Sequence, residues 1–391
     1  MKILIVAPRF PYPIEKGDKL RLYHQIRILS KQHRLVLFAL SDIEVAREDF
    51  DHLSQFVEKI HIFRLHKHRI IIDNLFRLFN PLPLQVLYFL NKRISRRMEA
   101  MVQNIKPDII FNQLIRTTEY SKKWSFPKVL DYMDAFSTGM HNRLDNSKIP
   151  YKWIYKLERN RLLKYEREIY GSFNAHTIIS KQDQQRIDVE FRDQIQVVPN
   201  GVDVDYFKPE KTQKEYDLCF VGNMGYRPNI IAAEYLCKII LPELNKLNPT
   251  IRVLLAGARP SQRVKALATK NVIVSGWMED IRSAYNKSKV FVAPIFTGIG
   301  QQNKVLEAMS MEMPCICTST VNHPIGSADW AELLVADNAE EFASKIFDLL
   351  EDRKLREQLG KKARKFVKKR YSWEFQVEKL NGIFEKVIHE G

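Results

Sequence analysis

The chain contains few glycines and lacks the cysteine spacing of metal-binding or disulfide-rich proteins. It has 14 glycines among 391 residues and four cysteines, Cys219, Cys237, Cys315 and Cys317. None of the four has the paired spacing of zinc ligands, and the last two lie in the apolar run PCICT. We therefore expect buried thiols in a reducing compartment, and we expect neither disulfides nor a metal ion.

Long apolar runs are also absent. The first residues, MKILIVAPRF, have an apolar core too short for a signal peptide, and no small-residue cleavage site follows them. No later stretch approaches the roughly 20 apolar residues that a membrane-spanning helix needs. These absences predict a cytoplasmic protein that is either dissolved or bound to the inner face of the cell membrane.

Acidic residues are too few to balance the basic ones. The chain has 62 Lys and Arg against 46 Asp and Glu, a net charge of +16, which favours an anionic partner. Residues 64–97 interleave eight Lys or Arg with apolar clusters and contain a single acid, Asp73. This pattern resembles a helix lying on an anionic bilayer more than a nucleic-acid groove, although an ordinary helix pair packed on a core remains open. The second basic run, residues 361–370, is typical of a solvated helix face.

Strands and helices alternate along both halves of the chain. Strand, loop, helix and strand fill the first forty residues, and six further apolar strands alternate with helices after residue 215. The pattern predicts an α/β protein with two doubly wound, Rossmann-like domains. We place the first domain at residues 1–198, before the turn at Asn200 and Gly201, and the second at residues 199–372. The last helix, residues 373–391, is long enough to cross back to the first domain.

The stretch FTGIGQQNKVLEAM, residues 296–309, joins a buried strand to a helix. Gly298 and Gly300 would let a phosphate approach the backbone at the start of that helix, where free N–H groups and the helix dipole attract anions. Lys304 could reach a diphosphate, and Glu307, one turn deeper, could accept hydrogen bonds from ribose hydroxyls. Alternatively, Lys304 and Glu307 form only a surface ion pair, and the glycines only make a tight turn.

Three more strands of the second half are followed by glycines. These glycines lie in the segments FVGNMGYRPN (220–229), LLAGARP (254–260) and VSGW (274–277). Because the carboxyl ends of parallel strands share one edge of the sheet, these loops should lie near the opening of the 303–309 helix. The motifs together indicate a site for a nucleotide diphosphate attached to a sugar.

At this point the chain resembles the retaining glycosyltransferase family 4, whose GT-B architecture has two facing Rossmann-like domains. The resemblance spans nearly the whole chain and rests on the start MKILIVAPRFPYPIEKGDKLRLYHQIRIL and on VVPNGVDVDYF, FVGNMGYRPN, VSGWMEDI, GIGQQNKVLEAM and YSW. KGDKLR and GYRPN are similar to a subgroup that builds exopolysaccharides and other surface glycans. The resemblance implies transfer of a hexose-type sugar from a nucleotide sugar to a glycan or lipid-linked acceptor.

The resemblance also assigns roles in the second domain. Family members often have two glutamates with seven residues between them; Glu307 matches the one that binds ribose, whereas Ile299 occupies the other position. Backbone N–H groups would then face the sugar, and Lys304 with Arg227 would hold the diphosphate. The implied donor-binding residues are Glu307, Gly298, Ile299, Gly300, Gln301, Asn303, Gly222, Asn223, Gly257, Trp277 and Met278.

In the first domain the family commonly has a histidine that helps to bind the donor sugar. The corresponding strand end, VLDYMDAF, has Met133 followed by Asp134, so Asp134 is taken as the catalytic contact together with Lys304 and Arg227. Asp131 is equally compatible with strand-end capping and with substrate binding. The acceptor or a phosphate would meet the start of the first helix at Gly17, Asp18, Lys19 and Arg21, although Asp18 is also a favourable helix N-cap.

The implied reaction needs no metal, because cations and a helix dipole stabilise the departing diphosphate. The sequence DVD at Asp203 to Asp205 mimics a metal motif but lies in a turn and is interpreted as structural.

A nucleotide-sugar epimerase of the same fold and a non-enzymatic binder of an anionic polymer are the alternatives. An NAD-dependent dehydrogenase is disfavoured because the first loop, PRFPYPIEKGDK, is not G-x-G-x-x-G, and a nucleic-acid binder because no recognised module is present.

Overall fold

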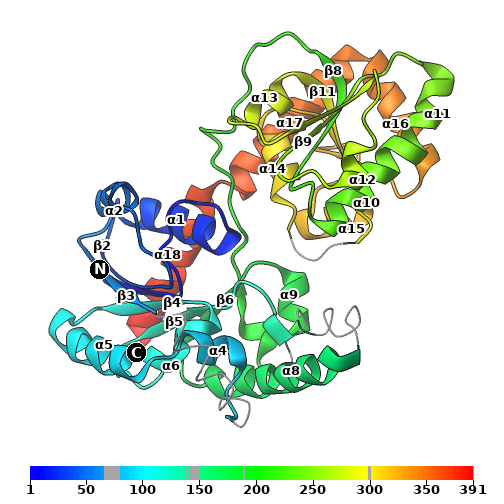
Figure 1. Cartoon of the computed structure of the whole chain (residues 1–391). Helices are drawn as coiled ribbons and strands as arrows, with labels where there is room; N and C mark the ends of the chain where they lie inside the picture. Colours follow the sequence, from blue (N-terminus) through cyan, green and yellow to red (C-terminus); the bar gives the residue numbers. More distant parts are fainter. Residues whose placement is uncertain (66–79, 138–139, 141–148, 188–189, 298–300, 391) are drawn as a thin grey trace. The chain divides into compact units, whose positions relative to one another are not determined.

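The computed structural model describes residues 1–65, 80–137, 140, 149–187, 190–297 and 301–390. Contacts divide the chain into two compact units: unit 1 is Met1–Pro199 with Gln376–Gly391, and unit 2 is Asn200–Phe375. Each unit has one parallel sheet with helices packed on it (Figure 1), which confirms the predicted α/β class. No helix among the described residues is both long and apolar enough to cross a membrane.

Unit 1 is built on seven parallel strands in the order β3-β2-β1-β4-β5-β6-β7. The strands are β1 (Lys2–Ala7), β2 (Arg34–Ser41), β3 (Lys59–Arg64), β4 (Ile109–Gln113), β5 (Lys128–Asp131), β6 (Ala175–Ile178) and β7 (Gln196–Val197). β1 pairs with β2 on one side and with β4 on the other. The order of the strands therefore reverses between β1 and β4, which is the topological switch point of this sheet.

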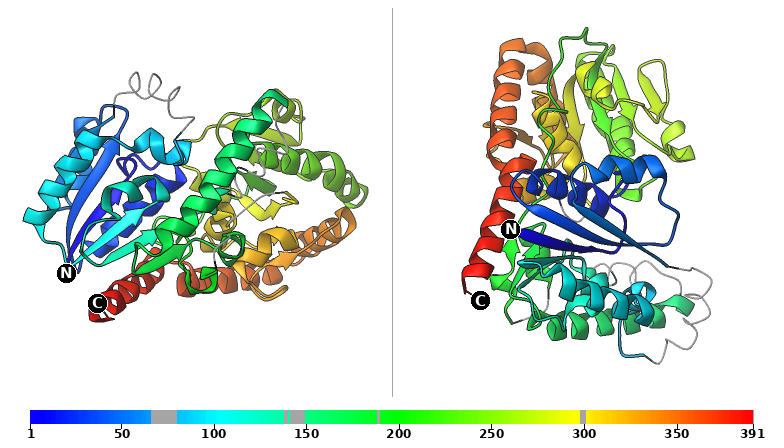
Figure 2. Two further views of the ribbon diagram at one scale, coloured as in Figure 1. Left: turned by 90° about the horizontal axis from the view of Figure 1, so that it is seen from below. Right: turned by 90° about the vertical axis from the view of Figure 1, so that its left-hand side faces the viewer.

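Helices cover both faces of this sheet. They are α1 (Gly17–Leu29), α2 (Arg47–Ser54), α4 (Leu84–Phe89), α5 (Lys92–Ile105), α6 (Thr118–Ser121), α8 (Ile149–Tyr170), α9 (Lys181–Arg186) and α18 (Trp373–Glu390); α8 is the long green helix of Figure 2. Ile3 and Ile5 of β1 pack in the core cluster that includes α1 and α18, whereas Leu4 and Val6 pack with α5. Successive side chains of a strand point to opposite faces, so β1 is buried on both sides.

Helix α18 completes the core of unit 1 from the far end of the chain. Leu380 and Phe384 are fully buried in the cluster that holds Ile3 and Ile5. The ring of Phe384 lies 5.4 Å from the ring of Phe111 in β4. The sequence predicts a last helix that packs on the first domain, and the contacts assign Gln376–Gly391 to unit 1.

Unit 2 has six parallel strands in the order β10-β9-β8-β11-β12-β13. They are β8 (Tyr216–Val221), β9 (Val253–Ala256), β10 (Val272–Gly276), β11 (Ser288–Ala293), β12 (Cys315–Cys317) and β13 (Leu334–Val335). Its helices are α10 (Arg227–Tyr235), α11 (Leu241–Leu247), α12 (Gln262–Lys265), α13 (Arg282–Asn286), α14 (Asn303–Ser310), α15 (Ser319–Ile325), α16 (Ala339–Glu351) and α17 (Arg353–Arg370). The switch point of this sheet lies between β8 and β11.

The structure differs from the predicted elements in three places. The sequence pattern over residues 230–247 predicts one helix, but the structure has a π-helical turn at Leu236–Ile240, just before Pro242, whose ring and missing N–H disturb a regular α-helix. The pattern over residues 339–359 likewise predicts one helix, but the structure has two, because the Asp352 side chain caps a new helix by accepting from the Leu355 N–H at 3.0 Å. Strand β3 was not predicted at all.

Candidate functional site

The carboxyl edge of the unit 2 sheet gathers the glycine loops. The loops after β9, β8 and β11 lie side by side because these three strands are neighbours in the sheet. Helix α10 starts after β8 and helix α14 after β11, so both helices open at the switch point. Helix starts at such a point present free N–H groups, which favour an anionic ligand.

Gly257 is required by a close approach of two backbones. Its φ is +135°, and a Cβ there would come within 1.9 Å of the Gly222 carbonyl oxygen. The Gly257 N–H donates to the Gly276 carbonyl at 2.9 Å, and the Gly222 N–H donates to the Ala256 carbonyl at 3.0 Å. These glycines therefore hold the ends of β8, β9 and β10 close together at this edge of the sheet.

Lys304 lies in the first turn of α14 and connects this helix to α10. Its Nζ donates to Asn229 Oδ1 at 2.5 Å and lies 5.2 Å from the centre of the Phe220 ring. A Cβ on Gly222 would come within 3.1 Å of the same Nζ, so the glycine leaves room for the ammonium group. Burial lowers the pKa of Lys304 to about 8, and the nearby Glu307 opposes that shift. In the described part of the chain no carboxylate forms an ion pair with Lys304, so its charge is held by a neutral amide.

Glu307 lies one turn further along α14 and accepts a hydrogen bond from a tyrosine. The hydroxyl of the fully buried Tyr285 donates to Glu307 Oε2 at 3.0 Å. Burial raises the pKa of Glu307. The two charged residues are close enough to influence each other but are not an ion pair, which removes the alternative of a simple surface salt bridge. The second oxygen, Oε1, has no hydrogen-bond partner among the described residues.

The other predicted donor-binding residues of unit 2 lie around these two. Arg227 is the first residue of α10 and is exposed, as is Asn223, whose Oδ1 accepts from the Gly225 N–H at 3.0 Å. The buried side-chain oxygen of Asn303 has no partner among residues 1–65, 80–137, 140, 149–187, 190–297 and 301–390. A buried polar atom of this kind usually has a bound water or ligand as its partner.

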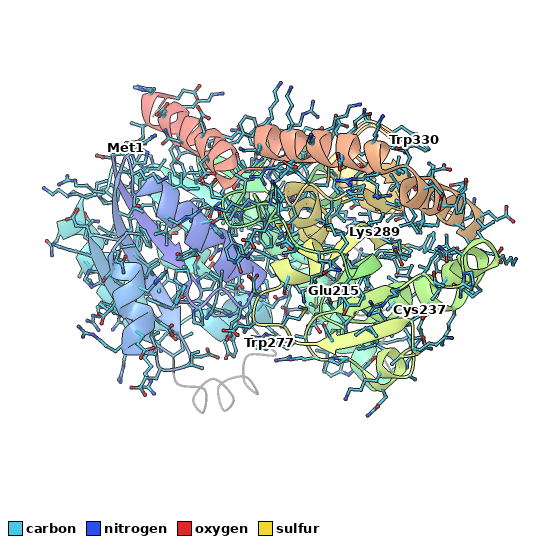
Figure 3. The ribbon with its side chains drawn as sticks, turned by 90° about the horizontal axis from the view of Figure 1, so that it is seen from above. Met1, Glu215, Cys237, Trp277, Lys289 and Trp330 are labelled. Carbon is cyan, nitrogen blue, oxygen red and sulfur yellow. The ribbon has the colours of Figure 1, made fainter. Side chains whose placement is uncertain are left out.

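Some predicted residues lie at the margin of this edge or outside the described residues. Gln301 donates through Nε2 to the Asn200 carbonyl at 2.9 Å, which ties the loop before α14 to the start of unit 2. Trp277, labelled in Figure 3, is 71% exposed, whereas Met278 is partly buried against the core. Gly298, Ile299 and Gly300 lie outside the described residues, as does much of the segment 64–97.

The predicted acceptor-side residues of unit 1 are mostly engaged by protein groups. Gly17 is the first residue of α1. Asp18 follows in the first turn and pairs with Arg9, so it is not the N-cap; Lys16 holds that position without a side-chain cap. Lys19 is buried and lies 3.5 Å from the Tyr12 carbonyl oxygen, and burial lowers its pKa.

Arg21 is placed differently from a ligand-binding residue. Its guanidinium is fully buried and donates to both oxygens of Asp131, at 2.7 and 3.1 Å. Thr177 Oγ1 donates to the same carboxylate at 2.8 Å. The expectation that Arg21 meets an acceptor is thus corrected: it neutralises Asp131 inside the protein, and Asp131 has a structural role.

Asp134 follows β5 beside a strained residue. Met133 has φ +61°, and Leu114, at the end of the neighbouring β4, has φ +64°; neither is a glycine. Asp134 is exposed, yet desolvation by the surrounding atoms raises its pKa to about 6, helped by Asp183 and Asp131. Left-handed, non-glycine residues at strand ends are frequent at functional sites.

Sequence reasoning missed two residues of the unit 2 site. Asn229 bridges Lys304 to the loop after β8, since its Nδ2 also donates to the Asn223 carbonyl at 2.9 Å. Its position in GYRPN, two residues after Arg227, was the available signal. No sequence signal indicated Tyr285, because its contact with Glu307 joins α13, which precedes β11, to α14, which follows it.

Part of unit 2 is similar in sequence to a known protein family. Residues 215–352 match the family described as "Glycosyl transferases group 1". Over 95% of this chain and 96% of the relative, the sequence is 23% identical to an uncharacterized 44.6 kDa protein in the cps region of Klebsiella pneumoniae. It is also 28% identical to the capsular polysaccharide biosynthesis glycosyltransferase CapM of Staphylococcus aureus, over 31% of this chain and 32% of CapM.

A solved structure extends the likeness to the fold of the whole chain. HepE of Anabaena, in complex with UDP, superposes with a TM-score of 0.68 over 99% of this chain and 100% of HepE, at 13% identity. The fold is therefore of GT-B type, with two Rossmann-like units. Together these findings support a glycosyltransferase and favour neither the epimerase nor the polymer binder.

Proposed function

We propose that the protein is a retaining glycosyltransferase of family 4, which moves a hexose from a nucleotide-diphosphate sugar to a glycan or lipid-linked acceptor in surface polysaccharide or glycoconjugate synthesis. The observation that carries the proposal is Lys304, a cation held by a neutral amide at the start of α14, at the switch point of unit 2. It lies within residues 215–352, which match glycosyl transferases group 1.

The donor diphosphate would lie at the starts of α10 and α14. Lys304 and Arg227 would supply positive charge, and free N–H groups of the helix starts would donate hydrogen bonds. Asn303 Oδ1, for which the described residues offer no partner, would accept from a donor hydroxyl or a bound water. Glu307, oriented by Tyr285, would accept from the ribose hydroxyls through its remaining oxygen. HepE is known in complex with UDP, which makes UDP the first nucleotide to test.

The chemistry follows from where charge develops. As the bond between the anomeric carbon and the diphosphate oxygen breaks, negative charge grows on the diphosphate beside Lys304, Arg227 and the helix starts. The acceptor oxygen forms a bond to the same carbon on the same face, and its proton passes to the departing phosphate oxygen. In this proposal the protein cations take the role of a metal ion.

The acceptor would be bound by unit 1. Asp134 is proposed to contact the transferred sugar or the acceptor, and the start of α1 at Gly17 offers backbone N–H groups to a phosphate. Lys19 and Asp18 are engaged by protein atoms and would act by shaping this loop. We place the enzyme in the cytoplasm at the inner face of the cell membrane, where lipid-linked acceptors are found.

A donor screen tests the proposal. UDP-, GDP- and ADP-linked sugars are added to the protein, and the thermal midpoint is measured; one donor class should raise it. Glu307→Ala should abolish that rise, whereas Glu340→Ala, an exposed glutamate in the first turn of α16, should retain it. If Glu307→Ala keeps the full rise, the ribose assignment is wrong. If no nucleotide sugar raises the midpoint, the proposed donor class is wrong.

A further inference from the structure

Helix α5 begins with a concentration of positive charge that the helix itself does not favour. Four of its first six residues are basic, Lys92, Arg93, Arg96 and Arg97, and its first turn has no acidic residue. The positive end of the helix dipole lies at this end, so cations here reduce helix stability. Asn91 caps the helix by accepting from the N–H groups of Arg93 and Ile94. The stability of α5 therefore does not explain why these basic residues are present.

The cations of α5 lie on its outer side. Met98 and Val102 are fully buried in the core cluster above the sheet, with Ile94 partly buried beside them, whereas all four basic residues are exposed. No described residue forms an ion pair with Lys92, Arg93 or Arg96. Their charge is thus presented to the surroundings.

Strand β3, the edge strand of the sheet, extends this charge. The Arg97 guanidinium lies 5.5 Å from the centre of the Phe63 ring, which joins α5 to β3. Lys59 and Arg64 are exposed at the two ends of the strand, with His61 between them. Burial lowers the pKa of His61, and repulsion from Arg97 and Lys59 adds to the shift, so these groups are close enough to repel one another.

A pocket of about 310 Å³ lies where α5 meets the sheet. Val36, Met101 and Ile105 give it apolar walls, Lys2 and Lys59 are its cations, and Glu58 is its acidic residue. Apolar surface beside clustered cations is the combination that binds a lipid headgroup region; a nucleic-acid groove would offer cations with stacking aromatics. Charge complementarity therefore favours an anionic lipid surface over a nucleic acid as the partner.

We propose that this face, formed by Lys59, His61, Arg64, Lys92, Arg93, Arg96 and Arg97 and called here the α5 face, docks the protein on a bilayer rich in anionic phospholipid. The inference deepens the proposed function, because docking brings the enzyme to lipid-linked acceptors. The binding itself does not depend on catalysis. Attraction between clustered Lys or Arg and anionic lipid is electrostatic and weakens with salt.

The second basic helix provides a matched control. Helix α17 carries exposed Lys361, Lys365 and Lys368, and its last turn is basic, where the dipole favours cations. Two triple variants of the full chain are compared, Arg93→Glu/Arg96→Glu/Arg97→Glu on α5 and Lys361→Glu/Lys365→Glu/Lys368→Glu on α17. Both change the net charge by the same amount, and circular dichroism checks that each is folded.

Cosedimentation uses vesicles of phosphatidylcholine and phosphatidylglycerol in equal parts, and vesicles of phosphatidylcholine alone. The wild type should sediment only with the anionic vesicles and be released by salt. The α5 variant should lose at least about tenfold in apparent affinity, and the α17 variant should stay within about twofold. Equal losses in both variants, an unaffected α5 variant, or binding of the wild type to neutral vesicles would overturn the proposal. Glu307→Ala should bind vesicles as the wild type does, which separates this test from that of the donor site.

Discussion

At the carboxyl ends of their strands the two sheets present different groups. The edge in unit 2 consists of glycines, helix starts and a lysine held by an amide, whereas the edge in unit 1 carries charged side chains that are paired with protein partners. The contrast is sharpest between Lys304, which no described carboxylate neutralises, and Arg21, which is fully buried against Asp131.

The difference separates charge that stabilises the fold from charge kept for a ligand. A buried ion pair already has its partner, and removing one member leaves an isolated charge in the interior. A cation with a neutral partner is available to an incoming anion. Substitutions of the paired charges at the unit 1 edge should therefore change stability, and substitutions at Lys304 should change binding.

The largest expected effect is that of Arg21→Met. It leaves the Asp131 carboxylate buried without its cation, which should lower the free energy of unfolding of unit 1 by about 3–5 kcal/mol. Urea unfolding followed by circular dichroism measures the change. The double variant Arg21→Met/Asp131→Leu should recover most of the loss. A single variant with wild-type stability and weakened substrate binding would instead make Arg21 a ligand residue.

Gly257→Ala should have the next largest effect, on unit 2. The new Cβ would overlap the Gly222 carbonyl oxygen at a φ of +135°, so the loops must separate, at a cost of about 3 kcal/mol in unfolding free energy. Gly276→Ala is the matched control: its φ is +72° and no atom lies within 4 Å of the added Cβ. The control should lose only about 1 kcal/mol. Equal losses in thermal unfolding would show that the close approach of the backbones is unimportant.

Lys304→Met should change binding with little loss of stability. Removing the ammonium should weaken nucleotide-diphosphate binding by about 2 kcal/mol, or about thirtyfold, as measured by calorimetry. Lys289→Met is the control, since Lys289, near the start of β11, pairs with Asp217 of β8 at the opposite end of the strands from the carboxyl edge. The comparison between the two sheet edges fails if both variants bind the nucleotide equally well.

The smallest expected effect concerns pH. Because the pKa of Lys304 is lowered to about 8, the folded, ligand-free protein binds fewer protons than the unfolded chain above that pH. Stability should therefore rise between about pH 8 and the ordinary lysine range, whereas nucleotide affinity should fall above pH 8 as the ammonium loses its proton. The affinity should fall by no more than about tenfold per pH unit. The fall should be absent in Lys304→Met, and its persistence there would assign it to another group.

The sequence predicted most of the fold because its information is local. Apolar runs such as KILIVA and the helices between them define parallel strands covered on both sides, as in β1. Strand β3, KIHIFR, was missed because its charged ends look like a loop, although pairing with β2 makes it a strand. The cap at Asp352 could have been predicted from an Asp placed before RKLRE; the π turn before Pro242 could not.

The candidate site shows where local reasoning ends. The spacing of Lys304 and Glu307 places both on α14, which is a local property. Their partners Asn229 and Tyr285 lie 75 and 22 residues away, and Arg21 meets Asp131 across 110 residues. In the sequence, Arg21 and Lys304 are simply cations near loops. Only the tertiary contacts separate the one that neutralises a buried carboxylate from the one left with a neutral partner.

Helix α18 has a consequence for how the protein is made. Unit 1 includes residues from both ends of the chain, and Leu380 and Phe384 fill the same core as Ile3. During translation unit 2 leaves the ribosome as a continuous segment before most of α18 emerges. Until then the core of unit 1 lacks the side chains that α18 supplies. Its nascent form would then be a client for chaperones until the last helix arrives.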